Sequence, residues 1–405
     1  MKLYRGGENF WRRIYIRHDC PICNSRDITT FLARKNVPVH QNLLMSDMQS
    51  ALDIKRGNLI MAYCEACGFI FNQAFDSSKL SYSKEYDNTQ TCSYFFDNYL
   101  SNLAAYMIKE KGIKRSRIVE VGCGKGQFLK KLIEFPGAEN IGYGFDPSYV
   151  GSDIELGGKI IFNKSFYNAE CANIPADVVV CRHVIEHIQD PIDLLTTIKA
   201  ATKNSPHAKM FFETPCVEWI LRNRIIWDFF YEHCSYFTGN SLSIAFELAG
   251  FDTERIQHIF GGQYIWLEAK VLFKKNSSII KNSRSLPLLV KEFARSERII
   301  QNNITKQIQD LSSDGEVALW GAGAKGVTFA NIIDPKCKLL SCIVDLNPKK
   351  QGKYLPGTGH PIISYEGLVD HSIKNIILMN PNYRNEISDL IKKPFPEIKL
   401  IDLKA

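Results

Sequence analysis

The chain has 405 residues, 45% of them hydrophobic, and a formal net charge of +7 at pH 7. This length allows two or three domains, and the composition is that of an ordinary globular protein. The charge excess is mild and contains no run of Lys and Arg, so it does not favour a nucleic-acid partner. No apolar stretch is long enough to span a membrane as a helix.

Residues 1–17 are basic and aromatic, but they lack the apolar segment and the cleavage site of a secretory signal. The twelve cysteines are therefore expected to be reduced thiols and metal ligands rather than disulfides. These features predict a soluble cytoplasmic protein, a monomer or dimer, without nucleic-acid or membrane partners.

Two Cys-x-x-Cys pairs stand in a first region, residues 1–80: Cys20 with Cys23, and Cys64 with Cys67. Each pair can point two thiolates at one metal ion, and two pairs complete the tetrahedron of a structural zinc site. Four protein ligands leave no open position for a substrate, so zinc would stabilise a small module with little core of its own. Two unrelated turns, or a redox pair, are the alternatives.

A second region, residues 81–275, contains a strand at 117–121 that breaks into a glycine turn and leads into a helix. Glu120 precedes the first glycine by two residues, which separates the loop from the ordinary dinucleotide fingerprint. The alternating glycines, which allow close ligand approach, are Gly122, Gly124 and Gly126. This pattern resembles motif I of class I S-adenosylmethionine (SAM) methyltransferases, which implies a Rossmann-like domain that binds SAM.

Strands alternate with helical stretches through the second region, which predicts a mostly parallel, doubly wound sheet. The expected strands cover residues 117–121, 141–146, 159–162, 176–181, 209–213 and 264–273. Asp146 ends the second strand, where a carboxylate can accept hydrogen bonds from both ribose hydroxyls of a nucleoside. Asp146 therefore joins Glu120 and the glycines in the predicted SAM site.

Candidate catalytic residues follow later strands, at the edge where doubly wound sheets bind ligands. His183 and His187 come after the strand at 176–181, and Glu232 and His233 stand in an aromatic segment further on. A carboxylate and a desolvated environment can hold a histidine near the pKa that proton abstraction requires. His233 is thus a candidate base, and a buried histidine bonded to the backbone is the alternative.

A third region, residues 276–405, follows a polar linker at 274–285. A long helix is expected at 286–311, and strands at 317–320, 339–344 and 376–379. Between them, residues 321–326 fit G-x-G-x-x-G, and Asp345 stands where an NAD site requires an acid. The loop is interpreted either as an NAD site or as part of a Rossmann-like domain that meets a substrate diphosphate or only supports the cleft.

In combination, these motifs resemble the three-domain, SAM-dependent sugar C-methyltransferases that act on nucleotide-linked 4-keto-deoxysugars. The motifs that carry the resemblance are the cysteine quartet, Tyr82 to Asn88, the SAM loop, Arg182 to His187, Glu232 with His233, and Gly321 to Gly326. The resemblance implies a zinc module over 1–80, a SAM-binding methyltransferase domain over 81–275, and a C-terminal Rossmann-like α/β domain, without nicotinamide, over 276–405.

The resemblance also implies carbanion chemistry on a nucleotide-linked 4-keto-6-deoxysugar, with C3 favoured over C5 as the methylated carbon. His233 would remove the hydrogen that the C4 ketone acidifies, and the enolate carbon would attack the SAM methyl. Glu232 would orient or polarise His233. Tyr86, with His183 or His187, would hydrogen-bond the sugar oxygens and stabilise the enolate.

The sequence departs from the family pattern at one place, because Tyr-His-Glu-His reads Phe230-Tyr231-Glu232-His233 here. The absent tyrosine hydroxyl leaves room for an O- or N-methyltransferase of a nucleotide sugar or other small molecule. A nucleic-acid binder or RNA methyltransferase would require a basic stripe among aromatic residues. The aromatic segment 82–99 has Lys84 as its only base, so we expect it to form a substrate wall.

Overall fold

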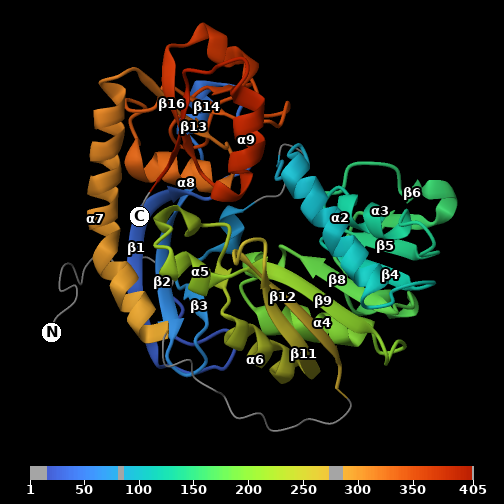
Figure 1. The fold of residues 1–405 in the computed structure, drawn as a ribbon. Helices are drawn as coiled ribbons and strands as arrows, with labels where there is room; N and C mark the ends of the chain where they lie inside the picture. The colour runs from blue at the N-terminus through green and yellow to red at the C-terminus, as the bar shows by residue number, and fades with distance from the viewer. Residues whose placement is uncertain (1–15, 81–85, 273–285, 404–405) are drawn as a thin grey trace.

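The structure is a computed structural model that describes residues 16–80, 86–272 and 286–403. The predicted linker at 274–285 and the motif residues 82–85 lie outside the described residues. The described parts of the chain form three β-sheets (Figure 1). These sheets fall broadly into the three predicted regions, and the exact region boundaries stay a prediction.

The first sheet is antiparallel, with the strand order β1-β2-β3-β10. Its strands are β1 (Ile28–Pro38), β2 (Arg56–Cys64), β3 (Ile70–Asn72) and β10 (Ser235–Tyr236). β10 comes from the second region and pairs Ser235 with Phe71 and Tyr236 with Ile70. The residues just before Ser235, which include the predicted base, are therefore held against the first sheet.

The second sheet has eight strands in the order β11-β12-β9-β8-β4-β5-β7-β6. The strands are β4 (Arg117–Val121), β5 (Ile141–Phe145), β6 (Ile154–Glu155), β7 (Ile160–Asn163), β8 (Val178–Arg182), β9 (Lys209–Pro215), β11 (Phe251–Ile259) and β12 (Tyr264–Val271). β4, β5, β7, β8 and β9 are parallel, whereas β12 is antiparallel to both neighbours. The chain leaves β4 toward β5 and later returns to β8 on its other side. This reversal creates a crevice at the carboxyl ends of β4 and β8, where such folds bind ligands.

Helices cover both faces of the second sheet. α2 (Tyr94–Lys109) and α3 (Gln127–Ile133) pack with Ile118 and Val178 on one face. α4 (Pro191–Ala201) and α6 (Gly239–Ala249) pack with Val119 and Val179 on the other. Because successive strand side chains point to opposite faces, the apolar runs of β4 and β8 supply both cores. The region is a three-layer α/β unit.

The third sheet is parallel, with the order β15-β14-β13-β16-β17. Its strands are β13 (Glu316–Trp320), β14 (Cys342–Val344), β15 (Ile362–Ile363), β16 (Ile373–Leu378) and β17 (Lys399–Asp402). Its helices are α7 (Leu286–Ser312), α8 (Ala324–Ile333) and α9 (Arg384–Ile391). α7 carries one apolar stripe and packs against β1 and α5 (Val217–Arg222), so it contacts all three regions (Figure 1).

Short helical segments connect these elements. They are α1 (Met48–Leu52) and the 3₁₀ turns Ser77–Lys79, Leu156–Gly158, Ala169–Asn173, Ile185–His187, Ile226–Asp228, Glu366–Asp370 and Pro381–Tyr383. Among all described helices, none combines the length and apolarity needed to cross a bilayer.

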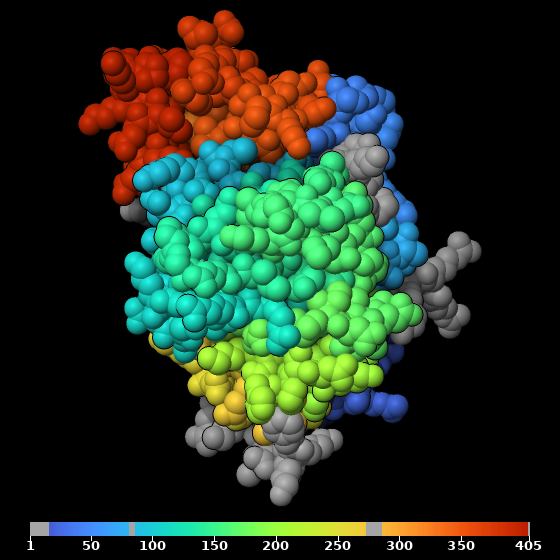
Figure 2. Space-filling view, turned by 90° about the vertical axis from the view of Figure 1, so that its right-hand side faces the viewer, coloured from blue at the N-terminus to red at the C-terminus, as the bar shows by residue number. Residues whose placement is uncertain are grey.

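The third region is seated on the amino end of α2 (Figure 2). Glu386 of α9 accepts hydrogen bonds from Ser93 Oγ at 2.5 Å and from the Tyr94 backbone N–H at 2.7 Å. Nearby, Asp87 accepts from Lys125 Nζ at 2.6 Å and from Asn347 Nδ2 at 3.1 Å. Asp87 therefore joins the glycine loop of the second region to the third region.

The predicted doubly wound sheet and the α/β unit that follows it are confirmed, with strand ends shifted by a few residues. The sequence pattern predicted neither the two-residue strand β6 nor β11, which is the edge strand next to β12. Its Asp, Glu and Arg residues sit on a partly exposed strand, so the apolar run that marks a buried parallel strand is absent.

Candidate active site

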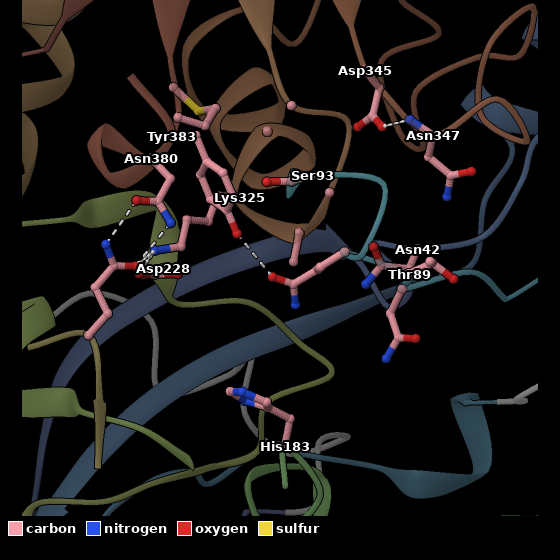
Figure 3. Close-up of a pocket in the computed structure, with 18 of the residues that line it drawn as sticks. Asn42, Thr89, Ser93, His183, Asp228, Lys325, Asp345, Asn347, Asn380 and Tyr383 are labelled. Carbon is pink, nitrogen blue, oxygen red and sulfur yellow. Dashed lines mark hydrogen bonds and ion pairs between the residues drawn. The ribbon is translucent and has the colours of Figure 1, made fainter. Parts of the chain in front are cut away.

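A cavity of about 290 Å³ lies between the second and third regions, at the carboxyl ends of β8 and β9. All five predicted catalytic residues line it: Tyr86, His183, His187, Glu232 and His233. Lys325 and Asp345 line it from the third region. Figure 3 shows His183 on one side of the cavity and Lys325, Asp345 and Asn380 on the other. The structure thus brings together residues that are far apart in the sequence.

The glycine loop after β4 adopts the left-handed backbone that its glycines allow. Gly122, Gly124 and Gly126 have φ values of 68°, 54° and 73°. An added Cβ would lie 2.2 Å from Val184 at Gly122 and 2.3 Å from Phe162 at Gly126, but would meet nothing within 4 Å at Gly124. The loop is therefore packed from below and open at Gly124, as close approach of a nucleoside cofactor requires.

Asp146 lies directly beside this loop, at the carboxyl end of β5. Its Oδ2 accepts a hydrogen bond from the Gly124 N–H at 2.9 Å, and its Oδ1 accepts from the Ser148 N–H at 2.8 Å. Glu120 is buried beneath the loop, where its carboxyl accepts from the Leu129 N–H at 3.1 Å. Burial raises the pKa of Glu120 to about 8. Glu120 supports α3 from the sheet side, and its direct contact with SAM stays a prediction.

His183 belongs to a buried ionic network. Its Nε2 lies 3.0 Å from Glu213 Oε1 and its Nδ1 lies 3.2 Å from Glu186 Oε1, while Arg182 Nε donates to Glu213 Oε2 at 2.6 Å. Burial alone would lower the pKa of His183, but the charges of Glu213 and Glu186 outweigh it and raise the pKa to about 9. His183 is therefore an imidazolium at neutral pH, and carboxylates occupy both of its ring nitrogens. Of the two histidines predicted to bond the sugar, the geometry favours His187.

His233 has the opposite electrostatic environment. Its ring centroid lies 4.2 Å from that of Phe230 and 4.6 Å from that of His187. Burial, followed by Coulombic interactions with His187, His183 and Lys325, lowers the pKa of His233 well below 6.5. The imidazole is thus neutral at pH 7 and able to accept a proton.

Glu232 is paired differently from the prediction. No hydrogen bond joins Glu232 to His233; its Oε1 lies 2.8 Å from His40 Nδ1, and its Oε2 accepts from the Tyr86 hydroxyl at 3.5 Å. His40 and Glu232 are both buried. The Glu232 carboxylate therefore contacts His40, just beyond the end of β1, rather than His233, its neighbour in the sequence. The expected orienting contact from Glu232 to His233 is therefore corrected.

Tyr231 does not replace the hydroxyl that is absent at Phe230. The Tyr231 hydroxyl accepts from the Asp76 N–H at 2.9 Å and donates to the Asp76 carbonyl at 3.3 Å. Its side chain is fully buried against the first region. Phe230 lines the cavity and presents an apolar ring at this position.

The second glycine loop repeats the hydrogen-bond pattern of the first. Asp345 Oδ2 accepts from the Ala322 N–H at 2.7 Å. Its Oδ1 accepts from the Asn347 N–H at 2.8 Å (Figure 3). These bonds match those of Asp146 to Gly124 and Ser148. The hydrogen bonds alone therefore do not tell a cofactor loop from a supporting loop.

The second loop differs from the first in the cations that it presents to the cavity. Lys325 and Lys350 both line the cavity. Lys325 Nζ lies 2.8 Å from Asp228 Oδ2, and Lys350 Nζ donates to the Ala322 carbonyl at 3.0 Å. Asp228 and Asp345 line the same end of the cavity, so the two ammonium groups stand among carboxylates rather than in a cationic patch.

Sequence reasoning missed His40, Asp228 and the Asp87–Lys125 pair. His40 carried no recognisable motif, because its partner Glu232 lies in a distant part of the chain. Lys325 stood inside a glycine motif and was visible as a cation. Its carboxylate partner Asp228, by contrast, became apparent only once the third region was packed onto the second.

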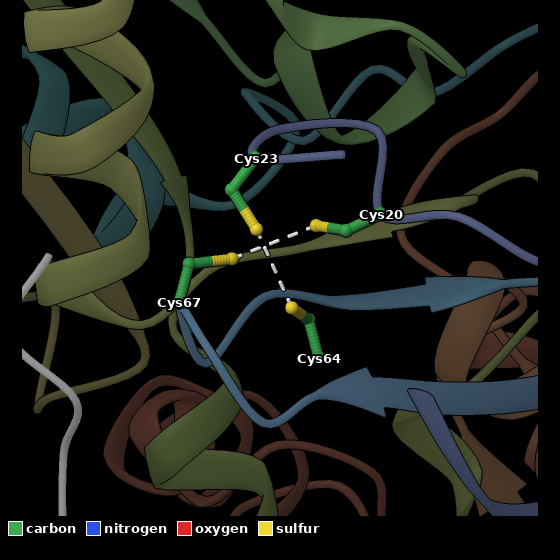
Figure 4. A group of neighbouring side chains, drawn as sticks. All are labelled: Cys20, Cys23, Cys64 and Cys67. Carbon is green, nitrogen blue, oxygen red and sulfur yellow. Dashed lines mark hydrogen bonds between the residues drawn. The ribbon is translucent and has the colours of Figure 1, made fainter. Parts of the chain in front are cut away.

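The cysteine quartet has the geometry of a tetrahedral metal site (Figure 4). The Cys20 and Cys67 sulfurs lie 3.5 Å apart, as do those of Cys23 and Cys64, and all four lie within 4.8 Å of one another. Thiolates about 2.3 Å from zinc would be separated by about 3.8 Å in a regular tetrahedron. The four residues therefore fit a structural zinc ion, which would fix the turn before β1 to the end of β2.

Comparisons with known proteins support this architecture. Residues 93–256 match a family model described as a methyltransferase domain, and residues 285–394 match one described as a C-methyltransferase C-terminal domain. The chain thus carries the domains of a SAM-dependent methyltransferase, in that order. These matches confirm the predicted class I Rossmann-like fold of the second region.

Individual relatives match only part of this chain. The C-methyltransferase NovU of Streptomyces niveus is 27% identical over 252 residues, which cover 57% of this chain and 60% of NovU. A ubiquinone biosynthesis O-methyltransferase of Vibrio cholerae serotype O1 is 30% identical over 112 residues, which cover 26% of this chain and 44% of that protein. The chain therefore spans less than two thirds of either relative.

Solved methyltransferase structures also match part of this chain. Magnesium protoporphyrin IX methyltransferase (ChlM) from Synechocystis PCC 6803, with bound SAH, is 16% identical and has a TM-score of 0.34. The match covers 44% of this chain and 84% of ChlM.

We expect the purified protein to contain about one zinc ion per chain, and Cys64→Ser to lower both the metal content and the melting temperature. Loss of the Cys64 thiolate weakens the site that joins the end of β2 to the turn before β1. Elemental analysis and thermal unfolding measure the two effects. Cys92→Ser, which changes an exposed cysteine outside the quartet, should alter neither, and metal-free wild-type protein would contradict the assignment.

We expect His183→Gln to lose stability relative to wild type, most strongly at or below pH 6.5. The pKa of His183 is raised to about 9, so its stabilisation is complete below its unfolded pKa and is lost as the pH rises through 9. The full effect is about 3 kcal/mol at most. Urea unfolding at pH 6.5 and pH 9 measures it, with the exposed His207→Gln as control. A difference that does not change with pH would refute the charged network.

Proposed function

We propose that the protein is a SAM-dependent C-methyltransferase that acts on a nucleotide-linked 4-keto-6-deoxysugar, with C3 favoured over C5. The observation that carries the proposal is a neutral, partly buried His233 in a cavity that it shares with Tyr86 and His187 and, from the third region, Lys325. The match to a C-methyltransferase C-terminal domain and the similarity to NovU support the same class of reaction.

In this proposal, His233 is the catalytic base. A C4 ketone acidifies the hydrogen on the adjacent carbon, and the neutral imidazole takes that proton while the C–H electron pair forms the enolate. Phe230 and His187 hold the ring from two sides, so proton transfer begins from a fixed position. Such a base contributes roughly 10²- to 10⁴-fold to the rate.

The developing enolate oxygen requires donors and positive charge. Tyr86 and His187 line the cavity and are the proposed donors to this oxygen. His183 contributes through its charge, since its nitrogens are bonded to Glu213 and Glu186. Glu232 acts as a positioning residue that is held by His40 and accepts a hydrogen bond from Tyr86, which lines the cavity.

The proposed cofactor residues are Gly122, Gly124, Gly126 and Asp146, with Glu120 beneath them. Bound SAM would supply a methyl group on positively charged sulfur, which is an electrophile suited to a carbon nucleophile. In this proposal the open side of Gly124 would admit the cofactor, and Asp146, which is bonded to the Gly124 N–H, would accept the ribose hydroxyls.

The other end of the cavity suits the nucleotide part of the substrate. In this proposal Lys325 and Lys350, with the N–H groups of the second glycine loop, would hold a diphosphate, which would compete with Asp228 for Lys325. This assignment gives the second loop a substrate role in place of NAD binding. It also accounts for a cavity that the second and third regions share.

The alternative is an O- or N-methyltransferase of a nucleotide sugar or another small molecule. The local match to ubiquinone O-methyltransferases keeps this alternative open. That match covers only 26% of the chain, so it does not separate carbon from oxygen as the methylated atom.

We expect one member of a panel of nucleotide 4-keto-6-deoxysugars to gain a methyl group when incubated with the protein and SAM in deuterated water. The same carbon should exchange hydrogen for deuterium, because the base acts before the methyl is transferred. Mass spectrometry and NMR identify the sugar and the carbon. A methyl on oxygen or nitrogen, without carbon exchange, would favour the alternative reaction.

We expect His233→Asn to lower turnover roughly 10²- to 10⁴-fold and to abolish deuterium exchange, because the proton acceptor is lost. SAM affinity, measured by calorimetry, should stay unchanged because His233 lies outside the glycine loop. The exposed His258→Asn serves as the matched control. Full turnover or exchange in His233→Asn would assign the base to another residue.

A further inference from the structure

A second cavity lies behind the active-site cavity. Its volume is about 190 Å³, and it is enclosed by the end of β1, the start of β2, residues 229–230, α7 and α8. Phe230 is the residue that lines both cavities. The two cavities are therefore back to back, with the Phe230 ring between them.

The walls of the second cavity carry positive charge. Arg34, Lys35 and Arg56 line it, whereas none of its lining residues is an Asp or Glu. Glu297 neutralises Arg34 in an ion pair at 2.6 Å. Arg56 instead donates to two backbone carbonyls, those of Asn36 at 3.0 Å and Gly357 at 2.8 Å.

Arg56 forms no ion pair with any carboxylate in the part of the chain that the structure describes. Burial lowers the pKa of its guanidinium, which is the expected response of a cation withdrawn from water without a counter-ion. A partly buried cation of this kind is stabilised by an anion.

Two buried polar atoms in the same walls also lack partners. Gln41 donates through Nε2 to the Pro38 carbonyl at 2.8 Å, but its Oε1 has no hydrogen-bond partner among the described residues. Thr328 Oγ1, on α8, likewise has none within those residues. Gln41 is 2% exposed and Thr328 is 8% exposed, so both atoms are withdrawn from water without a compensating hydrogen bond. This arrangement costs free energy, which a hydrogen bond to a bound ligand would offset.

We infer that this cavity is a second ligand site, for a small anion that also carries a hydroxyl group. Arg56 and Lys35 would hold the anionic group, the hydroxyl would donate to Gln41 Oε1, and Thr328 Oγ1 would complete the contacts. A phosphate monoester and a hydroxycarboxylate share this chemistry. The second site is independent of the reaction that takes place in the first cavity.

The second cavity is lined by structural elements that also line the active-site cavity, so a ligand bound there could affect the active site. Phe230 separates the two cavities, and its ring centroid lies 4.2 Å from that of His233. α8 begins at the second glycine loop, with Lys325 lining the first cavity and Thr328 lining the second. A ligand in the second cavity therefore contacts the two elements that form the wall of the first.

Calorimetric titration of the full-length protein with glycerol 3-phosphate, glycerate and glycerol tests the inference. We expect saturable binding of one or both anions, and binding of neutral glycerol weaker by about tenfold or more. The anion that binds more tightly shows whether the site prefers a phosphate or a carboxylate group. Absence of saturable binding by either anion, or equal binding of glycerol, would overturn the proposal.

Variants locate the bound anion. Arg56→Met should weaken binding by about tenfold or more, and Thr328→Val by about threefold or more. Thr328→Val removes a hydroxyl that has no partner while keeping the side-chain shape, so it stays informative if Arg56→Met unfolds. Arg115→Met, an exposed guanidinium of the second region, and Lys325→Met, in the first cavity, should both bind as wild type. Binding lost only in Lys325→Met would place the anion in the active-site cavity and refute the second site.

Discussion

The pairing of β3 with β10 is the constraint on which the site depends. Two residues from the middle of the chain, Ser235 and Tyr236, complete the sheet of the first region. This pairing fixes the backbone directly after His233, and the His40–Glu232 bond fixes it on the other side. A histidine in a loop would otherwise sample many positions, whereas here backbone hydrogen bonds to another region hold His233, the proposed base. The cysteine module is thus part of the active-site scaffold, although no cysteine of the quartet lines the cavity.

Opposed electrostatic environments then assign different roles to two histidines in the same cavity. Carboxylates surround His183 and keep it charged, while burial and nearby cations keep His233 neutral. The charge of His183 is one reason why the pKa of His233 falls, so the network around Glu213 affects the proposed base without touching it. One buried acid can in this way set the protonation of a group that it does not contact.

The sequence was sufficient for the parts of the fold that depend on local pattern. The apolar runs of β4 and β8 predicted two buried parallel strands, the glycines between β4 and α3 predicted the turn, and the cysteine spacing predicted that the four thiols meet, while the zinc ion itself stays a prediction. The sequence did not predict contacts between residues that are far apart in the chain, nor that two adjacent residues bond different partners. Glu232 adjoins His233 in the chain yet bonds His40, and Asp228 meets Lys325 only through packing of separate regions. Asp146 and Asp345 show the same limit of sequence-based prediction. Each accepts a hydrogen bond from an N–H of its glycine loop, although the surroundings of the two loops differ.

Glu386 has a consequence for motion between the regions. The first turn of a helix exposes unbonded N–H groups and a partial positive charge, and this carboxylate of α9 covers both at the start of α2. Withdrawal of the third region would therefore fray the amino end of α2, which packs against α3 beside the glycine loop. Opening of the cleft and loosening of the cofactor platform become a single event, so retention of the cofactor reports whether the third region is seated.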